Sequence, residues 1–125
     1  MLFDTDVLVW YLRGNLKAAA VMEEAEDRQI SVVSYMELLQ GARDKNEVKI
    51  IRNFLKELGF EIVPLTENIG HRASVYMEEY CLKVQMCIAD ALLAATAVEN
   101  HLTLCTGNNK HYRPIAEIEV QTFRP

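Results

Sequence analysis

Short apolar runs alternate along the chain with longer segments in which apolar residues recur at helical spacing. Residues 46–58 show this period, with Val48, Ile51 and Leu55 on one face and Gly59 directly after the segment. The short runs are rich in β-branched and aromatic residues, which favour strands. Strands are predicted at residues 1–4, 29–33, 60–63, 102–105 and 118–123, and helices at residues 7–12, 16–26, 34–42, 46–58, 66–82 and 88–99.

Strands that alternate with helices predict an α/β fold. Neighbouring strands in such a fold are joined by crossover helices, so the sheet is mostly parallel and has helices on both faces. Ligands bind to sheets of this kind in the crevice beyond the carboxyl ends of the strands. The residues that follow each predicted strand are therefore the first place to look for chemistry.

The composition is that of an ordinary globular protein and leaves this picture unchanged. The chain has 125 residues, of which 50% are hydrophobic and 25% charged, so we expect one domain over residues 1–125 with a core of its own. We find neither an apolar run long enough to cross a membrane nor a secretory signal. The three cysteines form no CxxC pair, and we expect all three to be reduced core residues of a cytoplasmic protein.

Acidic and amide residues occur where the predicted strands end. Asp4 and Asp6 follow the first strand, Glu37 comes one helical turn after the second, Asp90 opens the Ala-rich helix, and Asn108 follows the fourth strand. Converging carboxylates repel one another unless a cation lies between them, and oxygen ligands of this kind favour Mg²⁺ or Mn²⁺. Such a site can orient a phosphodiester, neutralise its charge and activate a water molecule.

Several of these residues also have a purely structural interpretation. Asp4 is placed to cap the next helix, and Glu37 stands three residues after Ser34, which is the spacing of a capping box. Asp90 falls in a first helical turn, where the helix dipole favours a carboxylate. Independent caps need not all lie at one edge of one sheet, and this favours a shared site.

Three segments together have the order and spacing of a known family. They are LFDTDVLV at the start, SVVSYMELLQGA around Glu37, and IADALLAATAVENHLTLCTGNNKHYRPI near the end. The chain thereby resembles the PIN-domain ribonucleases, in particular the VapC-type toxins of toxin–antitoxin pairs. The resemblance covers essentially the whole chain, and its last segment is the most specific.

The resemblance implies a PIN-like three-layer sandwich and Mg²⁺-dependent endonucleolytic cleavage of RNA, with Mn²⁺ as a possible substitute. Asp4 and Asp90 match the metal-binding acids of the family, and Glu37 matches the acid between them. Asn108 matches the polar position after the fourth strand. These four residues are therefore the expected catalytic residues.

Two positions depart from the family pattern. Many relatives have an aspartate where His111 stands, and many have Asn or Ser in place of Asp6. An additional carboxylate at Asp6 is therefore a candidate metal ligand that partly replaces the missing one, and Glu37 is a further candidate ligand.

The net charge of −5 argues by itself against strong nucleic-acid binding, but Asp4, Asp6, Glu37 and Asp90 account for most of the acidic excess. RNA would then be held by local groups of basic residues. One group is Lys110, His111 and Arg113, and the other is Lys45, Lys49, Arg52 and Lys56 at helical spacing. The second group is equally typical of a plain solvated helix face.

A toxin of this family implies two protein partners, a small antitoxin encoded beside it and a second copy of the toxin. Exposed apolar side chains would make these contacts, and a basic side chain of the antitoxin could enter the acidic crevice. Candidate contact residues are Trp10, Tyr11, Leu12, Ile51, Phe54 and Leu55, although all are equally suited to an ordinary core.

Three other functions remain open from the sequence. A haloacid-dehalogenase-like phosphatase also begins with a strand and Asp-x-Asp, but it needs a later catalytic lysine and a second acidic cluster. A receiver-type signalling domain needs an aspartate at the end of its third strand, where this chain has Val63 and Pro64. The third is a PIN fold that has lost activity and serves as a partner-binding module.

Overall fold

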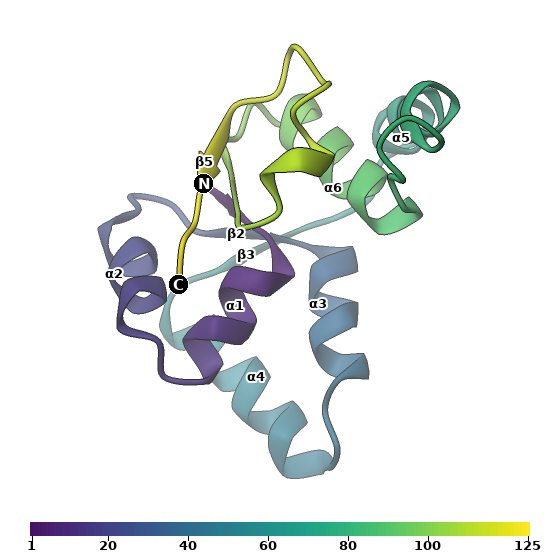
Figure 1. Cartoon of the computed structure of the whole chain (residues 1–125). Helices are drawn as coiled ribbons and strands as arrows, with labels where there is room; N and C mark the ends of the chain where they lie inside the picture. Colours follow the sequence, from purple (N-terminus) through teal and green to yellow (C-terminus); the bar gives the residue numbers. More distant parts are fainter.

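The computed structural model describes all 125 residues and arranges five short strands in one sheet (Figure 1). The strand order is β3-β2-β1-β4-β5, and every neighbouring pair is parallel. The predicted mostly parallel sheet is thus confirmed, with the N-terminal strand at its centre. The strands are β1 (Leu2–Phe3), β2 (Gln29–Ser31), β3 (Glu61–Val63), β4 (Leu104–Thr106) and β5 (Val120–Thr122).

Six α-helices connect these strands, close to the positions that the apolar pattern predicts. They are α1 (Thr5–Leu12), α2 (Leu16–Glu24), α3 (Val32–Gln40), α4 (Lys45–Glu57), α5 (Glu67–Tyr80) and α6 (Ile88–Glu99). A short 3₁₀ turn, η1 (Asn109–His111), follows β4 and was not predicted. None of the helices is long and apolar enough to cross a membrane.

Alternate residues of the two central strands enter different cores. Leu2 and Leu104 pack in one core with α5 and α6, whereas Phe3 and Cys105 pack in the other with α1, α2 and α4. This division follows from the strand geometry, because successive side chains point to opposite faces of a sheet. The molecule is therefore the predicted three-layer sandwich, with helices on both faces of the sheet.

The start of α3 differs from the prediction. Ser31, and not Ser34, is the N-cap, because its hydroxyl accepts the Val33 N–H at 3.1 Å and the helix begins at Val32. Two β-branched valines that favour a strand thus form the first helical turn instead. Since Ser34 is no cap, the predicted capping box between Ser34 and Glu37 does not form, and Glu37 is available for another contact.

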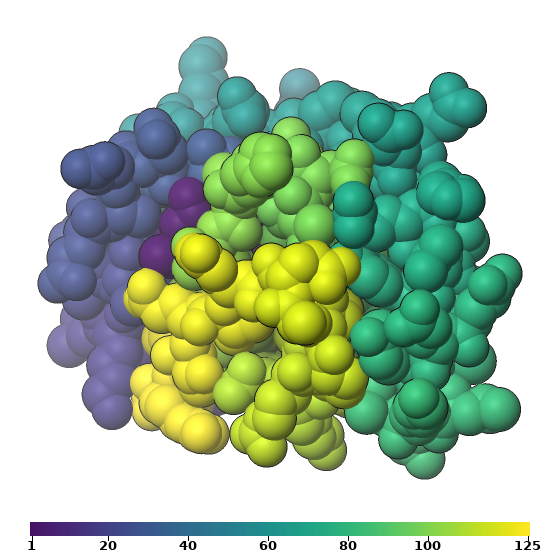
Figure 2. Space-filling model, turned by 90° about the horizontal axis from the view of Figure 1, so that it is seen from above, coloured from purple at the N-terminus to yellow at the C-terminus, as the bar shows by residue number.

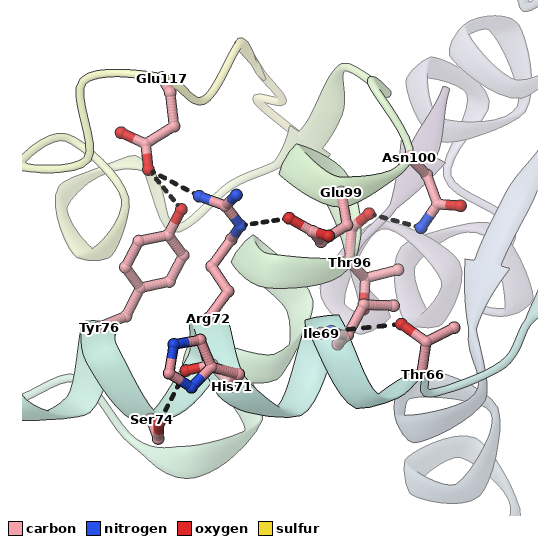
Figure 3. Close-up of polar contacts among 10 residues, drawn as sticks. All are labelled: Thr66, Ile69, His71, Arg72, Ser74, Tyr76, Thr96, Glu99, Asn100 and Glu117. Carbon is pink, nitrogen blue, oxygen red and sulfur yellow. Dashed lines mark hydrogen bonds and ion pairs between the residues drawn. The ribbon is translucent and has the colours of Figure 1, made fainter.

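A polar network joins the segment after β4 to the α5–α6 pair (Figure 3). Arg72 donates from Nε to Glu99 at 2.6 Å, and its Nη1 lies 3.5 Å from Glu117. Glu117 also accepts the Tyr76 hydroxyl at 2.6 Å. Figure 2 shows the C-terminal residues, in yellow, side by side with the teal and green residues of the second half of the chain on one face of the molecule.

Candidate active site

Asp4 stands at the junction between β1 and α1, and both of its carboxylate oxygens are held. Oδ1 accepts the Thr5 N–H at 2.7 Å, as the N-cap of α1, and Oδ2 accepts the Thr106 hydroxyl at 2.7 Å. Thr106 is the last residue of β4, the neighbouring strand in the sheet. The parallel register thus brings a residue 102 positions away into contact with Asp4.

Asp90 stands in the first turn of α6 and makes four polar contacts. Its Oδ2 accepts the Cys87 N–H at 3.3 Å and the Cys87 thiol at 3.2 Å, which forms a capping box with the N-cap residue. Its Oδ1 accepts the Tyr112 hydroxyl at 3.2 Å, and His111 Nδ1 lies 3.0 Å from Oδ2. One side chain therefore both caps the helix and contacts the residues that follow β4, so the structural interpretation of Asp90 is confirmed and its role as a metal ligand stays a prediction.

Asp6 and Gly107 approach each other very closely. The Gly107 N–H donates to Asp6 Oδ2 at 2.9 Å, and a Cβ at position 107 would lie only 2.7 Å from that oxygen. A larger residue at position 107 would therefore displace the Asp6 carboxylate from its present position. The other oxygen of Asp6, Oδ1, is buried and has no hydrogen-bond partner.

Glu37 and Asn108 complete the group. Glu37 Oε1 accepts the Thr5 hydroxyl at 2.8 Å, which ties α3 to the start of α1. The Asn108 N–H donates to Thr106 Oγ1 at 3.0 Å, and its side-chain amide lies 3.3 Å from His111 Nδ1. Both residues thus contact neighbours of the two central aspartates.

These side chains surround one cavity of about 210 Å³. The sequence predicted that carboxylates and an amide from distant parts of the chain converge at the carboxyl edge of the sheet, and the structure places all five of them there. The cavity is lined by Asp4, Thr5, Asp6, Ser34, Glu37, Cys87, Ala89, Asp90, Leu93 and Asn108.

The cavity is strongly unfavourable for negative charge. Burial, followed by the nearby charge of Asp6 and then of Asp90, raises the pKa of Asp4 to about 7, although hydrogen bonds from Thr106 and Thr5 oppose the shift. Burial likewise raises the pKa of Asp6 above its ordinary value. Burial and the negative charges of Asp4 and Asp90 raise the pKa of Tyr112, which keeps its hydroxyl a donor to Asp90. A cation bound between these carboxylates would stabilise their charged forms.

The donor set fits a hard divalent ion. The available ligand atoms are carboxylate oxygens of Asp4, Asp6, Glu37 and Asp90, and one of them, Asp6 Oδ1, is buried without a partner. Hard oxygen ligands suit Mg²⁺ or Mn²⁺. In the arrangement seen here, no three Asp, Glu, His or Cys side chains are placed to hold a metal ion together. Mg²⁺ commonly keeps several water ligands and is bound through only one or two carboxylates.

The predicted RNA-binding residues after β4 stay a prediction, whereas the expectation that all three cysteines are core residues is wrong. Lys110 and Arg113 are exposed and do not line the cavity, whereas His111 is half-buried against Asp90. Of the cysteines, only Cys105 is a fully buried core residue. Cys87 is exposed at the cavity, because the N-cap of a helix lies at its surface end.

The sequence interpretation missed four residues that hold the acids: Thr5, Thr106, Cys87 and Tyr112. A signal existed for Cys87, which stands three residues before Asp90 at capping-box spacing. The other three contacts join separate elements of the fold, and no local spacing reports them.

The fold and this cavity define a PIN-type protein, and comparisons with known proteins agree. The family model for the PIN domain matches residues 1–116, so the chain belongs to the PIN-domain family. PIN domains are in general nucleases. The match argues against the phosphatase and receiver-domain alternatives. Among curated proteins, none matches the chain significantly.

Solved structures of toxin–antitoxin complexes have the same fold. A toxin–antitoxin complex from Klebsiella pneumoniae contains a chain that is 29% identical, with a TM-score of 0.81 over 97% of this chain and 95% of that one. VapBC2 from Rickettsia felis bound to a promoter DNA fragment has 19% identity and a TM-score of 0.81, covering 98% of both chains. VapBC-1 from nontypeable Haemophilus influenzae has 18% identity and a TM-score of 0.78, covering 97% and 96%. The resemblance to VapC-type PIN proteins is thus confirmed.

The raised pKa of Asp4 predicts how stability depends on pH when a chelator is present. The native state holds this proton more tightly than the unfolded chain, so the free energy of unfolding should fall as pH rises from about 4 to about 7. Asp4→Asn should remove this fall and add about 2 to 4 kcal/mol at pH 8, since one pKa unit corresponds to about 1.4 kcal/mol. Urea unfolding at several pH values measures both quantities.

Asp44→Asn is the matched control, because Asp44 caps α4 at an exposed position and asparagine caps equally well. It should leave the pH dependence as in the wild type. Equal pH profiles for the wild type and Asp4→Asn would show that the folded protein does not raise the pKa of Asp4.

Proposed function

We propose that this chain is a Mg²⁺-dependent endoribonuclease that acts as the toxin of a toxin–antitoxin pair. The observation that carries the proposal is the convergence of Asp4 and Asp90 on one cavity in which Asp4 is destabilised as a carboxylate. A metal-dependent nuclease needs an arrangement of this kind, because a cation held by the acids offsets the charge of a phosphodiester. The family model and the toxin–antitoxin complexes with the same fold support the proposal.

In this proposal Asp4 and Asp90 hold the ion, with Asp6 and Glu37 as additional ligands or orienters of water. When bound, Mg²⁺ would lower the pKa of a water molecule and offset the charge that develops on the phosphate. Thr106 and Thr5 keep the Asp4 oxygens fixed, and Tyr112 does the same for Asp90. Prior fixation of ligands reduces the reorganisation needed at the moment of reaction.

Asn108 and the residues after it are proposed to contact the RNA. Asn108 lines the cavity, and the exposed Lys110 and Arg113 lie on either side of His111, which touches Asp90. Basic side chains beside an acidic cavity can hold the phosphates that flank the cleaved bond. Cytoplasmic RNA is the proposed substrate, in agreement with the three cysteines being free thiols.

Conservative removal of one charge should separate catalysis from folding. Asp90→Asn and Asp4→Asn should each lower cleavage of total cellular RNA at least about 100-fold, since each removes a proposed ligand of the ion. The measurement is gel analysis of RNA fragments with Mg²⁺ and with chelator. Asp44→Asn, a carboxylate outside the cavity, should cleave like the wild type.

Binding of the ion is measurable without any RNA. Mg²⁺ should raise the melting temperature of the wild type, and the rise should shrink in Asp4→Asn, because an ion that binds only the native state stabilises it. RNA cleavage that persists in chelator and in both variants would contradict the assignment of Asp4 and Asp90 as ligands of the ion. An Mg²⁺-induced rise without RNA cleavage would favour the alternative, a PIN-fold module that binds a partner without activity.

A groove between α1, α3 and α4 is the proposed antitoxin site. It has a volume of about 470 Å³, begins at Thr5 and Glu37 of the cavity, and has an apolar floor. The expected contacts at Ile51, Phe54 and Leu55 are wrong in part, because all three are at most 8% exposed and pack in the core beneath. The apolar lining consists of Val9, Leu12, Leu38, Ala42, Ile50 and Ile51. A helix that lies in this groove could place a basic side chain in the acidic cavity.

A charge in the groove should break the complex with the small protein encoded beside this chain. Ile50 is 49% exposed in the groove, and Ile50→Asp should abolish co-purification of the partner. Ile62 is 41% exposed on edge strand β3, outside the groove, so Ile62→Asp is the matched control and should keep the partner. Co-purification by both variants would exclude this groove as the docking site.

We also propose that the chain forms a homodimer, as the family resemblance implies. Large exposed apolar side chains occur at Leu82 and Ile88, at 92% and 68% exposure, next to the cavity residue Cys87. Exposed apolar groups of this kind mark interaction surfaces. Sedimentation velocity should show a dimer for the wild type and a monomer for Leu82→Asp, and a monomeric wild type would remove the dimer from the proposal.

A further inference from the structure

One helix concentrates unpaired positive charge on a protein that is acidic overall. Lys45, Lys49, Arg52 and Lys56 are all exposed on α4, at spacings of four, three and four residues, which place them on a single face. We call this face the α4 stripe. The opposite face is buried in the core through Ile51, Phe54 and Leu55, so the orientation of the helix is fixed. The stripe therefore always points away from the core.

No acidic side chain neutralises the α4 stripe. The ion pairs of the protein are Arg43 with Glu47, Arg72 with Glu99 and Glu117, and His111 with Asp90, and none includes a stripe residue. Cations at i, i+3 and i, i+4 repel one another and lower helix stability. Lys45 also stands at the first helical position, where the helix dipole disfavours a cation. The arrangement is thus costly for folding, unlike a face of mixed charges.

The α4 stripe encloses space for a ligand. Its side chains form a shallow hollow of about 600 Å³ together with Val48 and Asn53. Four cationic side chains, one amide and a single apolar residue, Val48, suit an anionic, well-hydrated chain more than an apolar helix. The stripe extends over about 16 Å, from eleven residues at 1.5 Å each, so it can contact several phosphates at once.

The same helix also borders the catalytic region. Ile50 and Glu47, on a different side of α4, line the groove that begins at Thr5 and Glu37. Figure 1 shows α4 at the edge of the molecule, by the C-terminal ends of α1 and α3, whereas the cavity is lined by residues at the start of α1 and in the first two turns of α3. A chain that passes along α4 would reach the cavity by following this groove.

We infer that the α4 stripe binds the phosphate backbone of the RNA at a distance from the cleaved bond. This inference rests on the proposed ribonuclease function. It identifies the surface that would bind the part of the RNA that lies outside the cavity. The acidic cavity repels RNA in the absence of an ion, so a separate positive surface supplies the attraction that steers the substrate toward it. An acidic segment of a protein would be the competing occupant.

Neutralising two cations tests the inference. Lys49→Gln/Arg52→Gln keeps good helix formers, and Lys83→Gln/Arg124→Gln removes the same charge at exposed positions outside the stripe. Both pairs are made in Asp4→Asn, and binding of a labelled single-stranded RNA is followed by fluorescence anisotropy in chelator at several salt concentrations. Melting temperatures confirm that all variants fold.

The stripe pair should bind RNA at least about tenfold more weakly at low salt, with a salt slope reduced by about 1.4, since each lost phosphate contact on a single strand removes about 0.7. The Lys83/Arg124 pair should bind like its parent. Equal affinities and slopes for the two pairs would overturn the inference. A poly-glutamate peptide that binds through the stripe as tightly as RNA would overturn it in favour of an acidic protein segment.

Cleavage by the otherwise unchanged wild type is scored separately, so the two proposals fail in different ways. Stripe-dependent RNA binding without any cleavage would remove the nuclease and keep the RNA surface. Cleavage by the wild type, together with RNA binding that does not depend on the stripe, would support the nuclease proposal and contradict the RNA-binding role of the stripe.

Discussion

Repulsion between carboxylates that the parallel sheet brings together is the constraint on which the rest of the structure depends. Asp4 follows the central strand, and its pKa is raised to about 7 by burial and by the neighbouring aspartates. The fold tolerates this cost because each acid has its own donors: Thr106 and Thr5 for Asp4, and Gly107 for Asp6. These donors fix the positions of the carboxylate oxygens.

Charge is distributed in the molecule in a way that suits a nuclease. Negative charge is concentrated in the cavity, and unpaired positive charge is concentrated on α4. The network around Arg72 has a different role, because its cation is balanced by Glu99 and Glu117 and joins the C-terminal segment to α5 and α6 (Figure 3). Polar clusters that are balanced stabilise the fold, whereas the two unbalanced ones are the surfaces proposed for the cation and for RNA.

Cys87 and His111 both contact Asp90, and His111 distinguishes this side of the cavity from that of relatives with an aspartate at the same position. The thiol and the imidazole both lie within 3.2 Å of Asp90 Oδ2. Relatives with an aspartate at the position of His111 would add a further negative charge there, whereas this chain adds a neutral or positive group. The carboxylate of Asp6, with its unpartnered Oδ1, lies among the same lining residues.

The sequence by itself determined the order of the strands and α-helices and the acidic and amide residues of the cavity. Helical periodicity, strand-forming runs and the positions after strands are local properties, and Asp4, Glu37, Asp90 and Asn108 follow from them together with the family resemblance. Tertiary structure alone decided that Val32 and Val33 are helical, that Ile51, Phe54 and Leu55 are core, and that Thr106 and Tyr112 hold the acids. Contacts such as Asp4 with Thr106 join residues 102 positions apart, and they exist only once the parallel strands are in register.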